Sequence, residues 1–210
     1  MSYSSVAVGA GLNNLGNTCF LNSVLQALSH SDYIVHSIAN SDHRKYCRAE
    51  ASGGLCVLCA FESHINMVRK APSPLSPTQF VKCLPMISST IQVGEQEDAH
   101  EFLRCLVDAM QRSILNEKVS KGTTRDEYPF SLFKGSVQNV VQCLQCKKTS
   151  YRTDPVEDLE LEIDRATSLD AALGFFTSIE TMTGDNKYAC EKCDTKTEVG
   201  RRPIPPLNST

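Results

Sequence analysis

The first half of the sequence carries apolar residues at helical spacing. The longest stripe follows the polar stretch QEDAH and consists of Ala99, Phe102, Leu103, Leu106, Val107, Met110 and Ile114. Spacings of three and four residues place such positions on one face of an α-helix. The same spacing predicts a helix that starts at Cys19 and ends near Ser29. Further helices are predicted over 58–69, which ends before the prolines of APSPLSP, and over 78–84, whereas 40–55 is expected to be irregular.

The second half of the sequence changes to β-type patterns. FKGSVQNVVQC is rich in β-branched residues and predicts a strand that ends at Cys143. Apolar and acidic residues alternate in VEDLELEID, which predicts a second strand over 156–163. The stretch from Thr167 to Asp170 resembles a capping box, with Asp in place of Glu, and predicts a short helix that ends near Phe176. The prolines of RRPIPPLNST argue against a strand at 200–210.

These patterns predict an α+β protein that is divided along the chain. We expect an N-terminal tail over 1–10, a helical region over 11–125, a β-rich region over 126–199 and a divergent tail over 200–210. The β-rich region contains paired cysteines, so we expect it to bind a metal.

Composition and charge exclude several classes of function. The 210 residues are 41% hydrophobic and 21% charged, which is typical of a globular protein that buries a core. The 21 Lys and Arg residues do not exceed the 24 Asp and Glu residues, which argues against nucleic-acid binding, including a zinc-stabilised DNA-binding module. No apolar run approaches the length of a membrane span, and MSYSSVAVGA lacks the features of a signal peptide. We therefore expect neither nucleic acid nor membrane as a partner.

The cysteines are arranged like metal ligands rather than like a disulfide framework. The sequence has 10 cysteines, and the pairs Cys56/Cys59, Cys143/Cys146 and Cys190/Cys193 each have C-x-x-C spacing. Secreted disulfide scaffolds are usually shorter chains. We expect a reducing compartment, in the cytoplasm or the nucleus.

Two of these pairs form the first predicted metal site. Four thiolates from Cys143, Cys146, Cys190 and Cys193 are the ligand set that structural zinc prefers. Such a closed site has no open position for catalysis, so the ion would connect the ends of a small subdomain. The alternative is two unrelated pairs of reduced thiols.

A second metal site is predicted with less support from the pattern. His43, Cys47, Cys56 and Cys59 have ligand types and spacing that suit another tetrahedral zinc ion. His64 is an alternative nitrogen ligand, and a loop with ordinary free thiols is the alternative to a metal site.

One further cysteine stands where a nucleophile would be placed. Cys19 lies between a turn-forming segment, Gly16 to Thr18, and the apolar run of a helix. The N-terminus of a helix favours the thiolate form of cysteine, which is the reactive form. Asn14 lies five residues upstream, from where its amide can serve as an oxyanion donor. From residue chemistry alone, a buried structural cysteine at a helix start remains the alternative.

The sequence resembles one family throughout most of its length. GLNNLGNTCFLNSVLQAL closely resembles the Cys box of the ubiquitin-specific proteases, the papain-like deubiquitinating enzymes. QEDAHEFL at 96–103 resembles the second signature of that family, and the two distal C-x-x-C pairs resemble its zinc-bearing fingers subdomain. These motifs span about residues 10 to 200, and the resemblance is expected to stop near Val199.

The resemblance implies a fold and site roles. It implies papain-like thumb helices followed by a partial β-rich zinc fingers subdomain, with the palm largely missing. Cys19 would be the nucleophile and Asn14 the oxyanion-hole amide. Asp98 would face the basic C-terminal tail of ubiquitin, and Gln96 of the same signature would contact substrate. The implied partners are ubiquitin and ubiquitinated proteins, and the implied cofactor is structural Zn²⁺.

The base that such a nucleophile needs is the missing part of the pattern. A cysteine hydrolase uses a histidine to carry the proton. In the resembled family this histidine has a Gly-His-Tyr context, and the five histidines here, at 30, 36, 43, 64 and 100, do not. His100 does not match the catalytic position either. We therefore expect a deubiquitinase-type cysteine hydrolase that is truncated before its histidine and has little or no activity alone. The alternative is a non-catalytic zinc-containing module that binds ubiquitin or another protein.

Overall fold

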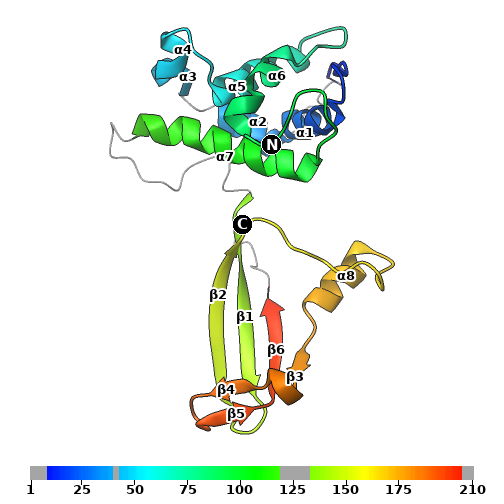
Figure 1. The fold of residues 1–210 in the computed structure, drawn as a ribbon, viewed down its shortest axis with the longest axis vertical. Helices are drawn as coiled ribbons and strands as arrows, with labels where there is room; N and C mark the ends of the chain where they lie inside the picture. Colours follow the sequence, from blue (N-terminus) through cyan, green and yellow to red (C-terminus); the bar gives the residue numbers. More distant parts are fainter. Residues whose placement is uncertain (1–8, 40–42, 119–132, 205–210) are drawn as a thin grey trace, which may run out of the picture. The chain divides into compact units, whose positions relative to one another are not determined.

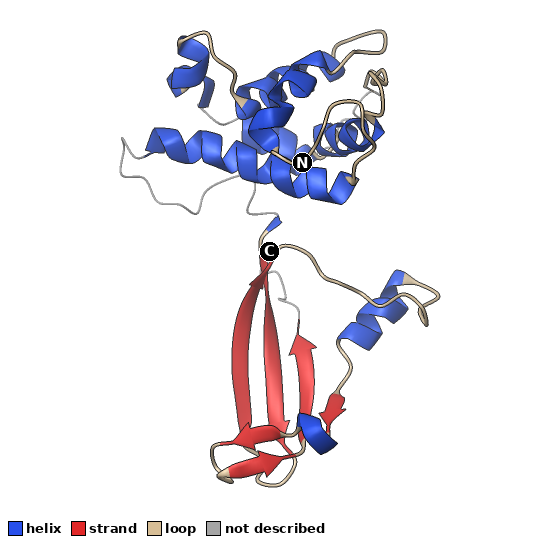
Figure 2. Ribbon diagram, in the orientation of Figure 1, coloured by secondary structure: helices blue, strands red, loops and turns tan. Residues whose placement is uncertain are grey.

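The computed structural model describes residues 9–39, 43–118 and 133–204. The chain divides into two compact units, Met1–Phe130 and Ser131–Thr210. In the described residues, the first unit is helical and the second carries the strands (Figures 1 and 2). The predicted α+β class is confirmed.

Seven helices lie in the described part of the first unit. They are α1 (Cys19–Ser29), α2 (Asp32–Ala39), α3 (His43–Tyr46), α4 (Arg48–Ala51), α5 (Val57–Val68), α6 (Thr78–Ile87) and α7 (Ala99–Lys118). The long helix α7 packs against α1, α5 and α6 (Figure 1). The predicted starts of α1 and α6 are confirmed, and the predicted α5 is displaced by one residue.

The apolar stripes of these helices form one core. The largest side chains with almost no exposed surface are Phe61, Phe80, Phe102, Leu21, Leu25, Ile34, Ile38, Leu58, Leu84, Leu106 and Met110. Edge-to-face ring contacts join Phe20 to Phe102, with centroids 5.4 Å apart, and Phe61 to Phe80, at 6.3 Å. Burial of each such side chain stabilises the fold by about 1.5–3 kcal/mol, so tertiary packing fixes how the helices lie.

The helical unit differs from the expectation in three places. Helix α2 was not predicted, although its buried residues Ile34 and Ile38 have helical spacing. The region expected to be irregular contains the one-turn helices α3 and α4. Helix α6 continues through Pro85, three residues beyond the predicted end, because Ile87 is buried in the core and holds the last turn.

The second unit is built on an antiparallel sheet. Its strands are β1 (Gly135–Cys143), β2 (Thr149–Val156), β3 (Glu180–Met182), β4 (Tyr188–Cys190), β5 (Thr195–Thr197) and β6 (Val199–Ile204), with α8 (Leu169–Phe176) and the 3-10 helix η2 (Gly184–Asn186) between them. Four strands follow the order β2-β1-β6-β3, while β4 and β5 form a separate hairpin. The register pairs Gly135 with Val156 and Cys143 with Val199.

Two strand predictions for this unit are wrong. The strand predicted over 156–163 does not form, because β2 ends at Val156 and no described segment pairs with the residues after it. Ile163 is accordingly 73% exposed. The tail from residue 200, expected to avoid strand structure, continues β6 as far as Ile204. Proline is tolerated there because β3 pairs with β6 only up to Arg201, so Pro203 has a paired strand on one side only.

The start of α8 is shifted by one residue from the predicted capping box. Ser168, not Thr167, is the N-cap, and its hydroxyl accepts a hydrogen bond from the Ala171 amide. The predicted end at Phe176 is confirmed.

Candidate active site and metal centres

Cys19 is the first residue of α1, and its side chain is exposed. The side chain of the N-cap residue, Thr18, makes no hydrogen bond to the first turn of this helix. The unpaired N–H groups of a first helical turn carry partial positive charge, which favours a thiolate at this position. The neighbouring Phe20 is buried and packs against Phe102 of α7, so the helix start is fixed while the thiol faces solvent.

The segment before Cys19 is held by a series of backbone contacts. The Asn13 amide donates to the Leu75 carbonyl at 2.8 Å, and the Leu75 amide donates to the Gly11 carbonyl at 2.9 Å. From α1, the Gln26 side chain donates to the Ala10 carbonyl at 2.8 Å, and the Asn22 side chain donates to the Asn13 carbonyl at 3.1 Å. The stretch that leads into Asn14, the predicted oxyanion donor, is therefore held to Leu75 and to α1.

Asn14 is the centre of a turn that closes onto its own side chain. Its Oδ1 accepts hydrogen bonds from the Gly16 amide at 3.1 Å, the Thr18 amide at 3.0 Å and the Thr18 hydroxyl at 3.2 Å. Positive φ angles of 96° at Gly16 and 51° at Asn17 curl the backbone so that these donors converge. Because the amide oxygen is occupied, the Nδ2 group is the part of the side chain that can serve a substrate.

Asp98, predicted to contact substrate, also has a structural role. Its Oδ1 accepts hydrogen bonds from the backbone amides of His100 at 2.6 Å and Glu101 at 3.1 Å, at the start of α7. The bonds from Glu101 and His100 lower the pKa of the Asp98 carboxyl, so it stays charged. Gln96 lies in the same exposed segment. The Asn17 side chain donates to the Gly94 carbonyl at 2.7 Å, which joins this segment to the Cys19 loop.

The four distal cysteines come together as predicted. The sulfurs of Cys143, Cys146, Cys190 and Cys193 all lie within 4.8 Å of one another. The Cys143–Cys193 and Cys146–Cys190 sulfur distances are 3.9 and 3.6 Å. A disulfide would need about 2.05 Å. Zn–S bonds of about 2.3 Å place the sulfurs of a tetrahedral site about 3.8 Å apart, so this cluster fits a zinc ion.

Two equivalent turns present these thiols. The Lys147 amide bonds to the Cys143 carbonyl at 3.0 Å, and the Asp194 amide bonds to the Cys190 carbonyl at 2.9 Å. Both Lys147 and Asp194 have left-handed backbone, with φ of 60° and 53°. One turn joins β1 to β2 and the other joins β4 to β5, so both pairs lie at hairpin ends as predicted.

Neighbouring groups support this cluster. The Thr197 hydroxyl lies 3.2 Å from the Cys143 sulfur, and an exposed ion pair of 2.8 Å links Lys148 to Glu191 across the two turns. The Cys146 amide and the Thr197 hydroxyl lower the pKa of Cys143 to about 6, whereas desolvation among the other thiols raises the pKa of Cys193 to about 12. Ion binding would displace the protons that the thiols of this cluster carry.

The second predicted cluster also assembles. His43, Cys47, Cys56 and Cys59 are all buried, with their ligand atoms within 4.8 Å of one another. The His43 Nε2 lies 3.2 Å from the Cys56 sulfur. Burial raises the pKa of Cys56, but the hydrogen bond with His43 and other donors outweigh it and lower the pKa to about 6. Burial raises the pKa of Cys59 and that of Cys47. His64, the alternative ligand, instead lies edge-on against Phe80 with centroids 5.4 Å apart.

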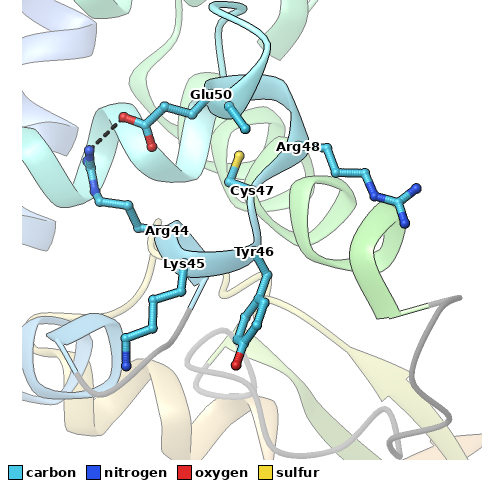
Figure 3. A pocket seen from close by; sticks show the side chains of 7 residues that line it. Arg44, Lys45, Tyr46, Cys47, Arg48 and Glu50 are labelled. Carbon is cyan, nitrogen blue, oxygen red and sulfur yellow. Dashed lines mark hydrogen bonds and ion pairs between the residues drawn. The ribbon is translucent and has the colours of Figure 1, made fainter.

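Arg44 connects the helices around this second cluster. Its guanidinium donates to the Cys59 carbonyl at 2.9 Å and to the Ser63 hydroxyl at 2.6 Å, and it forms ion pairs with Glu50 and Glu62. A pocket of about 360 Å³ lies beside it, and Cys47 is the cluster residue that lines this pocket (Figure 3). Arg44 and Glu50, which form an ion pair, both line this pocket.

Comparison with known proteins decides the family. A family model described as ubiquitin carboxyl-terminal hydrolase matches residues 10–203. The chain belongs to the ubiquitin carboxyl-terminal hydrolase family. The match continues four residues past Val199, where the sequence analysis ended the resemblance, and these residues belong to β6. Membership confirms the family resemblance and supports a cysteine deubiquitinase as the class of enzyme.

Several relatives share this region of the ubiquitin carboxyl-terminal hydrolases. Ubiquitin carboxyl-terminal hydrolase 42 of Homo sapiens is 38% identical over 198 residues, which are 93% of this chain and 15% of the human protein. Ubiquitin carboxyl-terminal hydrolase 23 of Arabidopsis thaliana is 38% identical over 200 residues, 93% of this chain and 23% of that protein. Probable ubiquitin carboxyl-terminal hydrolase 16 of Schizosaccharomyces pombe is 38% identical over 190 residues, 87% of this chain and 40% of that protein. The chain spans less than half the length of these relatives.

Solved structures show the same fold. A chain of the SAGA Ubp8/Sgf11/Sus1/Sgf73 DUB module bound to ubiquitin aldehyde matches with a TM-score of 0.78 at 23% identity, over 97% of this chain and 46% of that chain. The same module bound to monoubiquitin matches with a TM-score of 0.77 at 24% identity, over 98% and 47%.

The structure also gives contacts that the sequence did not suggest. Asn17 and Thr18 were expected only to form a turn, and their side chains join Gly94 and Asn14. The bond from Thr197 to the first cluster was not expected either. Within the described ranges, no helix combines the length and apolar character needed to cross a membrane.

Proposed function

We propose that this chain carries the nucleophile-bearing part of a thiol-dependent deubiquitinase. The observation that supports this most is an exposed Cys19 at the start of α1, in a loop where the Asn14 amide oxygen is already engaged. In the family to which the chain belongs, a thiol cleaves the isopeptide bond after the C-terminal glycine of ubiquitin. Ubiquitin and ubiquitinated proteins are therefore the proposed substrates, and solved neighbours of the same fold are bound to ubiquitin aldehyde and monoubiquitin.

The proposed reaction has two steps. The Cys19 thiolate adds to the glycine carbonyl, and the resulting oxyanion accepts a hydrogen bond from Asn14 Nδ2. The C–N bond then breaks, the leaving amine takes a proton, and a thioester remains on Cys19. Water hydrolyses the thioester, which releases the ubiquitin carboxylate and restores the thiol.

A base must move the protons in both steps. His30 bonds to the Gln26 carbonyl, His43 bonds to Cys56, and His64 is buried beside Phe80. These three histidines are therefore engaged elsewhere. We propose that the present chain forms the complex with ubiquitin but turns it over slowly or not at all, as expected for a sequence without a Gly-His-Tyr segment.

Asp98 and Gln96 are proposed to contact the ubiquitin tail. The charged Asp98 carboxylate lies at the start of α7, in the segment that Asn17 joins to the Cys19 loop. A fixed negative charge at this place suits a basic peptide that leads to Cys19.

Both cysteine-rich clusters are proposed to hold structural Zn²⁺. Each offers four N or S ligands, which gives a closed tetrahedral site that stabilises the fold and takes no part in the reaction. We also propose a reducing location, in the cytoplasm or the nucleus, because the C-x-x-C spacing of the cysteines suits metal ligands rather than a disulfide framework.

A pair of electrophiles tests the proposed function. One carries an alkyne or vinyl warhead at the C-terminus of ubiquitin, and the other carries the same warhead on a short peptide with the ubiquitin tail sequence. We expect the ubiquitin reagent to modify the wild-type chain much faster than the peptide reagent, and Cys19→Ala to abolish this reaction. Equal rates for the two reagents would contradict recognition of ubiquitin, and unchanged labelling of Cys19→Ala would contradict the nucleophile. Ubiquitin binding without any labelling would favour the non-catalytic binding module.

A further inference from the structure

Thr18 precedes Cys19, and its hydroxyl both accepts and donates a hydrogen bond within the loop. It is 3% exposed. Its hydroxyl oxygen accepts a hydrogen bond from the Leu15 amide at 3.0 Å, and its proton is donated to Asn14 Oδ1 at 3.2 Å. The Thr18 amide donates to the same Oδ1 at 3.0 Å. Thr18 therefore binds the Asn14 oxygen through two donors.

These donors determine which way the Asn14 amide faces. The backbone amides of Gly16 and Thr18 can only donate, so the atom that they contact must be the oxygen. A rotation of the amide by half a turn would place its NH₂ group against two N–H groups. The Nδ2 donors are thereby kept on the opposite edge of the amide, where a developing oxyanion can accept from them.

We propose that Thr18 is a positioning residue for the oxyanion donor: its buried hydroxyl holds the Asn14 amide in the orientation that presents Nδ2 to the tetrahedral intermediate. The proposal rests on the proposed function, since it gives Asn14 its role through Cys19 chemistry. Thr18 itself does not touch the reacting atoms. Its hydroxyl also pairs the Leu15 amide, so its loss leaves that N–H without its partner.

Ubiquitin aldehyde isolates this role from the general stability of the fold. The Cys19 sulfur forms a bond to the aldehyde carbon, the carbonyl π electrons move to the oxygen, and the thiol proton reaches that oxygen through solvent. The thiohemiacetal oxygen accepts from Asn14 Nδ2, whereas unmodified ubiquitin makes no such tetrahedral centre. The ratio of the two affinities therefore reports the oxyanion donor, and binding of unmodified ubiquitin reports the rest of the site.

The experiment measures both dissociation constants for the full chain and for four variants. Thr18→Val replaces the hydroxyl by a methyl group, Thr18→Ala removes it without that methyl, and Thr18→Ser keeps it. Ser23→Ala removes a hydroxyl of α1 that bonds to the Phe20 carbonyl. We expect Thr18→Val and Thr18→Ala to reduce the aldehyde-to-ubiquitin ratio by roughly tenfold or more, in line with loss of an oxyanion donor. Thr18→Ser should restore the ratio, and Ser23→Ala should leave it unchanged.

The outcomes separate the two proposals. Thr18→Val and Thr18→Ala are judged wherever the variant still binds unmodified ubiquitin. A wild-type ratio in such a variant would overturn the positioning role and leave the proposed function intact. A reduced ratio in Thr18→Ser equal to that in Thr18→Val would overturn it as well, because the hydroxyl is present in Thr18→Ser. If the wild-type chain binds the aldehyde no better than ubiquitin, the proposed function fails, and the role of Thr18 fails with it.

Discussion

The side-chain amide of Asn17 donates a 2.7 Å hydrogen bond to the carbonyl oxygen of Gly94, 77 residues further along the chain. Asn17 adjoins the nucleophile loop, and Gly94 lies shortly before Asp98 and α7. Both residues have positive φ, 51° at Asn17 and 92° at Gly94, so the backbone on each side is shaped for this contact. The bond joins the Cys19 loop to the segment that leads into the second signature.

Loss of this contact should loosen the site without straining the turn. In Asn17→Gly the left-handed backbone is retained and the donor is removed. We expect a destabilisation of about 1 kcal/mol, the usual net value of one hydrogen bond, and slower labelling of Cys19 by a ubiquitin electrophile. Urea unfolding and labelling rates provide the measurements. Asn13→Ala, which removes the exposed bond to Ser76, is the matched control and should leave the labelling rate unchanged. If Cys19 of the Asn17→Gly variant is labelled at the wild-type rate, the hydrogen bond from Asn17 to Gly94 does not affect the site.

The two roles of Asp98 can be separated by an isosteric change. Asp98→Asn keeps an oxygen that caps α7 but removes the charge proposed to face the ubiquitin tail. We expect little change in the denaturant midpoint and a loss of ubiquitin affinity of about two- to fivefold, as for an exposed ion pair. Asp98→Ala should lower both the denaturant midpoint and the ubiquitin affinity, because the helix cap is lost together with the charge. If Asp98→Asn binds ubiquitin as well as the wild type at low and high salt, the charge has no part in recognition.

Metal content tests the two clusters one by one. We expect two zinc ions per chain, and one ion in either Cys146→Ser or Cys59→Ser. Chelators should lower the melting temperature because ion binding contributes to folding. Elemental analysis with matched protein quantification supplies the count. One ion per wild-type chain that persists in Cys59→Ser would eliminate the second site, and Cys83→Ser serves as a control at a buried cysteine outside both clusters.

Acid should destabilise the helical unit through His64. Burial lowers the pKa of His64 from 6.5 to about 4, and its Nε2 has no hydrogen-bond partner among the described residues. The unfolded chain therefore takes up a proton at this residue below pH 6.5, while the folded protein does so only near pH 4. The stability that the protein keeps by burying a neutral His64 is fully present above pH 6.5 and is lost as the pH falls toward 4.

The size of this effect is set by linkage. Between pH 7 and pH 5.5 the wild type should lose about 1 kcal/mol more stability than His64→Leu, measured by urea unfolding at both values with zinc in excess. His36→Leu, at an exposed histidine of α2, should show the wild-type dependence. Parallel pH profiles for the wild type and His64→Leu would contradict a neutral buried imidazole.

Local pattern was sufficient for much of the helical unit and for the metal ligands. The stripe from Ala99 to Ile114 predicts α7 because a helix repeats its apolar positions regardless of its partners. Likewise, C-x-x-C spacing predicts the turns at Cys143 and Cys190 because one short turn brings each pair together.

Contacts between distant segments were beyond the reach of such patterns. The bond from Asn17 to Gly94 depends on how α1 and α7 pack, and a single polar side chain carries no periodic signal. Alternation in 156–163 indicated a strand, but a strand needs a neighbour, and the described residues supply none there. Conversely, the sequence analysis used the prolines near Pro203 as evidence against a strand. The segment nevertheless forms β6, because it pairs with β1 and Pro203 lies opposite Asn139.

The most direct test of the central claim is the position of the bond that a ubiquitin electrophile forms. The chain is incubated with ubiquitin that carries a C-terminal alkyne, and the product is analysed by intact and peptide mass spectrometry. Cys19 is exposed and the other nine cysteines are buried or half-buried, so the short peptide with the same warhead is incubated in parallel to report the reaction that exposure alone gives. We predict one ubiquitin per chain, attached to the peptide that contains Cys19. Attachment to any other cysteine, or no attachment to folded protein, would contradict the assignment of Cys19 as the nucleophile.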